Sequence, residues 1–310
     1  MSSLAPSYSR LLDFIRLGRP LHLFGGALFY TIGATIAQTP GGAFQRPVFL
    51  LGLAAMLAIQ LVTHYSNEYF DFDTDQLNRN HTRWSGGSKV LPAGTLPRSI
   101  ALYASLGCLV IAAVPVVWAA ILSNNSLRSI LIALVGMGLA WSYSSPPLSL
   151  NRRGLGEFTG AILIPGLTAL YGFQLQAAAA LSRELLALIP LCLFQFAMLL
   201  AVNLPDLESD QAVGKRTLVV LIGRKQAGRL YSAAVAAAVL SLPLLAWFQV
   251  LPPAFAAAIV LALPIAIGQI ISMARGAWQK PNTWEALGFW SIGQLMAAGV
   301  GIFAVTLLRA

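Results

Sequence analysis

The stretch LLGLAAMLAIQLVTHYSNEYFDFDTD, residues 50–75, joins two segments of opposite character. Its first seventeen residues, from Leu50 to Ser66, are almost wholly apolar. Its last nine residues hold four acids, although the whole chain of 310 residues has only eleven Asp and Glu. A long apolar run predicts a membrane helix. We therefore expect a helix that ends in an acidic cluster at a membrane surface.

The composition of the whole chain agrees with a membrane protein. Hydrophobic residues make up 57% of the chain and charged residues only 10%, against about 25% charged in a soluble domain. Apolar runs recur from Leu21 to Leu308, so we predict an all-α integral membrane protein. The expected spans are residues 20–39, 47–70, 99–122, 127–144, 155–176, 184–205, 226–247, 251–274 and 284–308.

The basic residues orient these nine spans. Of the 20 Lys and Arg, sixteen lie in the N-terminus and in or beside the loops around 71–98, 145–154, 206–225 and 275–283, which leaves four on the other side. This bias predicts that the richer side faces the cytoplasm, as in a bacterial-type inner membrane. The basic residues flank membrane helices, so binding to nucleic acid is not expected.

The acids gather on the same predicted side as the basic residues. One cluster closes the second predicted helix, and the other closes the sixth helix in the stretch NLPDLESD, residues 203–210. Together they hold seven of the eleven acids, namely Glu68, Asp71, Asp73, Asp75, Asp206, Glu208 and Asp210.

The spacing within each cluster predicts a metal site. Side chains three or four residues apart share one helical face. Stacked carboxylates at a helix C-terminus repel one another and oppose the helix dipole, so a cation is needed between them. Oxygen ligands from Asp and Asn suit Mg²⁺, which proteins hold with one or two carboxylates plus substrate phosphates. The side chains that share a face within their own cluster are Asn67, Asp71, Asp75, Asn203, Asp206 and Asp210.

Two other interpretations of the clusters stay open at this point. Acids at helix ends are often solvated loop residues, although two clusters with the same spacing disfavour this. Salt bridges to nearby Lys and Arg are the second interpretation, and they are compatible with a metal site. Basic side chains also serve as phosphate partners, for which Lys89, Arg153 and Lys215 are our candidates.

The motif N-x-x-x-D-x-x-x-D from Asn67, with D-x-x-x-D from Asp206, resembles the UbiA superfamily of intramembrane prenyltransferases. The resemblance covers nearly the whole chain. It implies nine transmembrane helices around a central cavity. It also implies a single domain over residues 1–310, built from two four-helix halves and a final helix.

A second stretch points to one branch of that superfamily. YSSPPLSLNRRGLGE, residues 143–157, is similar to a segment of 1,4-dihydroxy-2-naphthoate prenyltransferases, which serve menaquinone and phylloquinone biosynthesis. RPLHLF, from Arg19, also resembles that branch. The chain departs from the branch at Leu148 and at residues 151–153. Other acceptors therefore stay open, including 4-hydroxybenzoate, homogentisate, haem, chlorophyllide and glycerol phosphate, as does terpene cyclisation.

The resemblance implies a Mg²⁺-dependent transfer of a polyprenyl group from its diphosphate to an aromatic acceptor. Asn67 and the four motif aspartates would hold the metal, and Asn203 would bind substrate beside them. We expect aromatic rings near the motifs to stabilise a carbocation through their faces, and the candidates are Tyr65, Tyr69, Trp141 and Tyr143.

Two features of the sequence leave more than one interpretation. His64 lies three residues before Asn67, so it is either a core-packed histidine or a contact for the acceptor. A secondary transporter is the alternative from a different class of protein. Transporters place acids near the membrane midplane at broken helices, whereas these acids lie at helix ends, so transport is disfavoured.

The shared-face interpretation makes a mutational prediction. Asp71→Ala or Asp206→Ala should abolish prenyl transfer while the protein still folds and inserts. Asp73→Asn should be mild, because Asp73 lies off the shared face. Turnover of each purified variant is the measurement, and near-normal turnover in either alanine variant would contradict a two-cluster site. Equal damage from Asp73→Asn and Asp71→Asn would contradict the helical assignment.

Overall fold

The described part of the chain is helical. A computed structural model describes residues 7–38, 43–123, 126–177 and 181–309, and within these ranges no β-strand is formed. The only β-type pairing in the described residues is an isolated bridge between Arg153 and Arg216. The predicted helical class is thus confirmed for this part of the chain.

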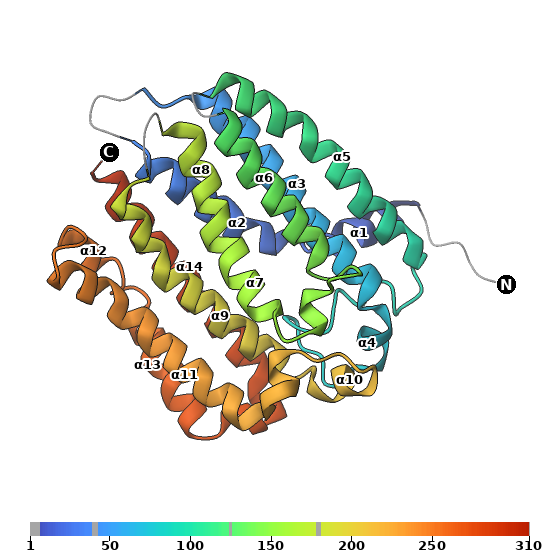
Figure 1. Cartoon of the computed structure of the whole chain (residues 1–310). Coiled ribbons are helices and arrows are strands. Elements are labelled where there is room, and N and C mark those ends of the chain that lie inside the picture. The colour runs from blue at the N-terminus through green and yellow to red at the C-terminus, as the bar shows by residue number, and fades with distance from the viewer. Residues whose placement is uncertain (1–6, 39–42, 124–125, 178–180, 310) are drawn as a thin grey trace.

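The first half of the chain forms long helices together with several short helical elements (Figure 1). The elements are α1 (Ser7–Leu17), α2 (Pro20–Ile36), α3 (Arg46–Phe70), α4 (Phe72–Leu77), α5 (Arg98–Leu122), α6 (Ser126–Ser142), the 3₁₀ turn η1 (Leu150–Arg152), α7 (Gly156–Ala161), the π-helical segment η2 (Ile162–Leu167) and α8 (Thr168–Gln176).

The second half of the chain also consists mainly of long helices joined by short elements. The elements are the 3₁₀ helix η3 (Arg183–Leu188), α9 (Ile189–Asn203), α10 (Leu207–Ala212), α11 (Leu218–Trp247), α12 (Ala254–Ala257), α13 (Leu263–Ala274), the 3₁₀ turn η4 (Ala277–Gln279) and α14 (Pro281–Leu307).

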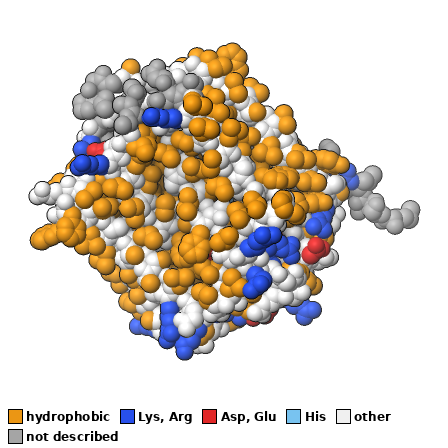
Figure 2. Space-filling model, viewed as in Figure 1, with side chains coloured by type: hydrophobic (Ala, Val, Ile, Leu, Met, Phe, Trp, Pro, Cys, Tyr) orange, Lys and Arg blue, Asp and Glu red, His pale blue; other side chains and the backbone are white. Residues whose placement is uncertain are grey.

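Length and composition mark the protein as an integral membrane protein. Six helical stretches in the described residues are long and apolar enough to cross a membrane, and they contain α3, α5, α7–α8, η3–α9, α11 and α14. Three shorter apolar helices, α2, α6 and α13, accompany them. Figure 2 shows apolar side chains spread over the body of the molecule, with Lys and Arg gathered toward its ends.

Several predicted spans differ from the helices observed. The span 155–176 is interrupted by the π-helical segment η2, which contains Pro165, a residue that cannot donate a backbone hydrogen bond. The span 251–274 is helical only at Ala254–Ala257 and Leu263–Ala274, with turns between. Helix α2 ends at Ile36, and the final residue of the predicted span 20–39 lies outside the described residues.

Helix α1 was not expected from the sequence. It lies before the first predicted span, and the ring of Phe14 stacks on Tyr65 of α3 with ring centroids 5.4 Å apart. Leu11 and Ile15 on α1 are exposed, as is Arg16. A short helix with apolar and charged side chains at the end of a bundle is typical of the membrane interface.

Two apolar clusters form the core on either side of α2 and α8. One joins α3, α5 and α6, and the other joins α9, α11, α13 and α14, with residues of α2 and α8 in both. Gly33 on α2 lies against the backbone of Ala169 on α8, where a Cβ atom would come within 1.7 Å of the Ala169 carbonyl oxygen. Glycine therefore lets α2 and α8 approach closely at the middle of the molecule.

The two acidic helix ends lie at the same end of the bundle. Figure 1 shows α4, which follows α3, beside α10, which follows α9, and the two short helices are in contact. The short helix α4 begins directly after Asp71, and the short helix α10 begins directly after Asp206. This arrangement brings the two sequence motifs together, although they are far apart in the chain.

Candidate functional site

A cavity of about 290 Å³ runs into the bundle from the end that carries the acidic clusters. Its polar end is formed by side chains that include Asn67, Asp71, Asp206 and Lys215. Deeper in the bundle the wall becomes apolar, and the side chains there include Phe29, Met56, Leu163, Tyr171, Leu199 and Met296. The cavity thus combines a charged mouth with an apolar interior.

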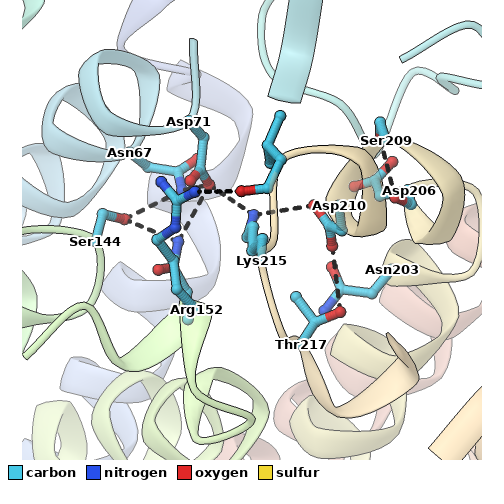
Figure 3. Close-up of polar contacts among 12 residues, drawn as sticks. Asn67, Asp71, Ser144, Arg152, Asn203, Asp206, Ser209, Asp210, Lys215 and Thr217 are labelled. Atoms are coloured by element: carbon cyan, nitrogen blue, oxygen red, sulfur yellow. Dashed lines mark hydrogen bonds and ion pairs between the residues drawn. The ribbon is translucent and has the colours of Figure 1, made fainter. Parts of the chain in front are cut away.

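Lys215 lies between the two clusters and pairs with both (Figure 3). Its Nζ atom is 2.9 Å from Asp71 Oδ2 and 3.4 Å from Asp210 Oδ1. All three residues are less than 10% exposed, at 9%, 4% and 1% respectively. Carboxylates this deeply buried need a charge partner, and the Lys215 ammonium meets that need for one acid of each cluster.

Amide and hydroxyl groups complete the surroundings of Asp71. Its Oδ2 accepts hydrogen bonds from Asn67 Nδ2 at 2.7 Å and from Asn151 Nδ2 at 3.1 Å. Ser144 Oγ lies 3.2 Å from Asn67 Nδ2 and 3.3 Å from Asn151 Nδ2. The backbone hydrogen bond from Asp71 N to the Asn67 carbonyl places these two side chains on one face, as the spacing predicts.

The second cluster is fixed by partners from other segments. Asp206 Oδ1 accepts a hydrogen bond of 2.6 Å from Asn78 Nδ2, which directly follows α4. Asp210 Oδ2 accepts from Thr217 Oγ1 at 3.2 Å. Asn78 therefore links the end of the first motif to the second motif.

Burial governs the ionisation of these groups. Burial raises the pKa of Asp210 to about 7, although the Lys215 ammonium acts in the opposite direction. Burial also raises the pKa of Asp75 well above its usual range, and the Asp71 and Glu68 carboxylates raise it further. Burial alone would lower the pKa of Lys215, but the Asp71 and Asp210 carboxylates raise it above its ordinary value.

Asp75 and Lys89 lie together beside the cavity mouth. Asp75 is 7% exposed, and its backbone carbonyl accepts a hydrogen bond of 2.7 Å from Lys89 Nζ. Burial lowers the pKa of Lys89, whereas the carboxylates of Asp75 and Asp206 act in the opposite direction. The Asp75 carboxylate packs on Gly87, where a Cβ atom would come within 2.1 Å of Asp75 Oδ2.

Two other predicted substrate-binding residues have different surroundings. Asn203 lines the cavity but donates its Nδ2 to Glu157 Oε1 at 2.9 Å, away from the aspartates of its own motif. Arg153 is exposed, and its Nη2 donates to the Pro147 carbonyl at 2.8 Å. The structure therefore brings Asn203 to the cavity wall and does not bring Arg153 there.

Three of the four aromatic candidates lie away from the cavity. Tyr143 lines it as expected. Tyr65 instead stacks on Phe14 of α1, and Tyr69 lies under Arg98, whose guanidinium carbon is 4.7 Å from the ring centroid. Trp141 meets the ring of Phe70 edge-on. Closeness in sequence to the motifs did not place these rings on the cavity side of their helices.

The sequence pattern did not predict the ion pair between Arg19 and Glu68. Arg19 Nε donates to Glu68 Oε1 at 2.9 Å, and Arg19 Nη2 lies 3.3 Å from Asn67 Oδ1. Glu68 also accepts from the backbone N and the Oγ of Ser88, at 2.8 and 2.7 Å. Glu68 therefore ties α2 and the loop after α4 to the end of α3, and it is a structural member of the cluster.

The off-face acids lie outside the site, as predicted. The side chain of Asp73 is 67% exposed and lies 3.6 Å from Arg98 Nη1. The side chain of Glu208 is 55% exposed and pairs with Arg224 through two hydrogen bonds of 2.5 Å each. Neither residue faces the cavity.

The oxygen atoms at the mouth fit a Mg²⁺ ion shared with a substrate. Asp71 Oδ1 and Asn151 Oδ1 are buried without a hydrogen-bond partner, and such oxygens are the ligands that Mg²⁺ prefers. In the part of the chain that the structure describes, no group of three His, Cys, Asp or Glu side chains forms a metal centre by itself.

Comparison with known proteins identifies the family. The model of the UbiA prenyltransferase family matches residues 27–293 of the chain. The chain belongs to the UbiA prenyltransferase family. The family predicted from the two aspartate motifs is thereby confirmed, and the membrane helices agree with it.

The chain is similar to prenyltransferases of two different names. The chain is 31% identical over 191 residues to 1,4-dihydroxy-2-naphthoate octaprenyltransferase of Bacillus subtilis, a match that covers 62% of this chain and 60% of that protein. It is 29% identical over 222 residues to digeranylgeranylglyceryl phosphate synthase of Thermococcus gammatolerans, covering 69% of this chain and 70% of that protein. The match thus spans less than two thirds of the Bacillus protein.

Solved structures share the fold. An apo UbiA homologue from Aeropyrum pernix K1 has a TM-score of 0.68 at 18% identity, covering 93% of this chain and 97% of that one. A UbiA homologue from Archaeoglobus fulgidus, bound to DMAPP and Mg²⁺, has a TM-score of 0.60 at 17% identity, covering 94% of this chain and 99% of that one.

The position of Lys215 gives a prediction for stability. Lys215→Gln should destabilise the metal-free protein by about 3–5 kcal/mol, because it leaves buried carboxylates without their partner. Thermal unfolding in detergent with a chelator is the measurement, and the exposed Lys280→Gln is the matched control. Equal unfolding temperatures for the two variants would contradict this role of Lys215.

Proposed function

We propose that this protein transfers a polyprenyl group from its diphosphate to an aromatic acceptor in a Mg²⁺-dependent reaction, with 1,4-dihydroxy-2-naphthoate as the acceptor. The observation that carries the proposal is the meeting of both aspartate motifs around Lys215, at the mouth of an apolar cavity. A charged mouth suits a diphosphate, and an apolar interior suits a prenyl chain.

The diphosphate would lie at the polar end. Asn67, Asp71, Asp75, Asp206 and Asp210 are the residues that would hold the metal there. Bound Mg²⁺ supplies positive charge that neutralises the leaving diphosphate. Asn67 and Asn151 are oriented toward this region by their hydrogen bonds to Asp71 and by the Ser144 hydroxyl.

Lys215 and Lys89 would both help to balance the negative charge of the diphosphate. Lys215 contacts an aspartate of each motif and lines the cavity, so it is placed to meet phosphate oxygens as well. Lys89 lies beside Asp75, and the Asp206 carboxylate acts to raise the pKa of Lys89. Arg153 would not belong to this group, since its side chain is exposed and donates to the Pro147 carbonyl.

The apolar interior would protect the reacting centre. Ionisation of the allylic C–O bond leaves a carbocation that water would quench, so the wall around it must exclude water. The wall offers Phe29, Leu163 and Leu199, together with the ring of Tyr143 nearer the polar end. The face of that ring is suited to stabilise positive charge.

The charged groups of the cavity favour an aromatic acceptor over a glycerol phosphate. A second phosphate substrate would need cations of its own. The Lys and Arg on the described cavity wall are Arg19 and Lys215, and both already pair with carboxylates. The likeness to digeranylgeranylglyceryl phosphate synthases makes glycerol phosphate the second candidate acceptor.

The arrangement in the membrane is also part of the proposal. The six long helices and the three shorter ones, α2, α6 and α13, would together make nine spans in one domain over residues 1–310. The sixteen-to-four distribution of Lys and Arg supports a mouth that faces the cytoplasm. The bilayer would supply the long-chain prenyl substrate from the side.

Product analysis tests the function. We expect detergent-purified protein with Mg²⁺, a labelled polyprenyl diphosphate and 1,4-dihydroxy-2-naphthoate to yield a prenylated, decarboxylated naphthoquinol in mass spectrometry. The control is the same mixture with a chelator, which should yield none. A product formed only with 4-hydroxybenzoate, homogentisate or glycerol phosphate would keep the class and reject the acceptor. A cyclic hydrocarbon would indicate a terpene cyclase, and no consumption of diphosphate would reject the proposal.

A further inference from the structure

Two histidine side chains lie next to each other on the cavity wall, farther from the mouth than the aspartates. His22 on α2 and His64 on α3 both line the cavity, and their ring centroids are 5.8 Å apart with the rings edge-on. For His64 the sequence left two interpretations open, a core-packed histidine or a contact for the acceptor. The structure places both rings on the same cavity wall.

Gln60 joins the pair from the next turn of α3. Its Nε2 donates to the His22 carbonyl at 2.8 Å, which fixes the orientation of the amide. Its Oε1 lies against Gly26, where a Cβ atom would approach within 2.2 Å. The absence of a side chain at Gly26 therefore leaves room for the Gln60 carbonyl oxygen between α2 and α3.

Each of these three side chains keeps a polar atom without a partner. His22 Nδ1, His64 Nε2 and Gln60 Oε1 are buried and have no hydrogen-bond partner. A buried polar group without a hydrogen-bond partner destabilises the folded protein. All three side chains line one stretch of the cavity wall, so a ligand bound there is placed to supply hydrogen bonds to them.

Hydroxyl groups are the chemistry that satisfies these atoms. The Gln60 oxygen can only accept, and each neutral imidazole nitrogen either donates or accepts, depending on its tautomer. A hydroxyl both donates and accepts, so it suits all three. A carboxylate or phosphate has no proton to offer the Gln60 oxygen, so an anion alone would leave that atom unsatisfied.

The position of the pair fits the acceptor rather than the diphosphate. Gln60, His64, Asn67 and Asp71 follow one stripe of α3 along the cavity. Seven residues of helix separate His64 from Asp71, a rise of about 10 Å. His64 therefore lies about two turns below Asp71 and one turn below Asn67, on the inner side of the residues proposed to hold the metal.

We propose that His22, His64 and Gln60 form the binding pocket for the hydroxyl groups of an aromatic diol acceptor. This pocket rests on the proposed function for its role in transfer, but its binding of a diol can be measured without turnover. The pocket distinguishes a dihydroxylated ring from an unhydroxylated ring of the same size.

The test compares two probes that differ only in their hydroxyl groups. Binding of 1,4-dihydroxy-2-naphthoate and of 2-naphthoate is measured under reducing conditions, with no prenyl diphosphate present. The full-length protein should bind the diol about tenfold more tightly, as expected for two hydrogen bonds of ordinary strength. No preference for the diol in the unmodified protein would overturn the proposal without the need for any variant.

The variant His64→Phe tests the pocket itself, because it keeps a ring and removes the polar nitrogens. The matched control is His81→Phe, since His81 is exposed outside the cavity. His64→Phe should bring the two probes to nearly equal affinity, whereas His81→Phe should keep the tenfold preference. An unchanged preference in both variants would overturn the proposal.

Failure of the pocket and failure of the proposed function give different results. If the protein transfers no prenyl group but His64→Phe removes the diol preference, the pocket stands and the reaction is wrong. If transfer occurs, the Michaelis constant for the naphthoate should rise about tenfold in His64→Phe while that for the prenyl diphosphate stays within about twofold. A rise confined to the prenyl diphosphate would assign the pair to the donor substrate and overturn the proposal.

Discussion

The contact of the Lys215 ammonium with Asp71 and Asp210 is the interaction on which the rest of the structure depends. The two carboxylates come from helix ends that are distant in sequence, and both are almost fully buried. Without a cation between them, their burial and mutual repulsion would drive these ends apart. With it, α3 and α9 can end at the same place and close a single cavity below them.

Other polar contacts follow from this central arrangement. Asn78 binds Asp206, and Glu68 binds both Arg19 and Ser88, so the loop after α4 is tied to helices of both halves of the chain. These bonds satisfy the polar groups at the mouth and leave the interior to apolar side chains. The separation of a charged mouth from an apolar interior is what a reaction through a carbocation requires.

The sequence alone predicts those parts of the site that depend on local helix geometry. Four-residue spacing placed Asn67 and Asp71 on one face and Asp73 off it, because helical periodicity is a local property. Contacts such as Asn151 with Asp71, or Asn203 with Glu157, depend on how distant segments pack. No periodic signal marks them in the sequence. The interruption at Pro165 and the added helix α1 were likewise beyond a hydropathy pattern.

The joint binding of metal and diphosphate is the most direct test of the account. The measurement is the unfolding temperature of the unmodified protein with Mg²⁺ alone, with a non-hydrolysable prenyl diphosphate analogue alone, and with both. The account predicts a large shift only with both, since neither cluster holds the metal without phosphate oxygens; saturation at a hundredfold excess would add about 2.7 kcal/mol. A full shift with either component alone, or none with both, would contradict a site shared between the two motifs.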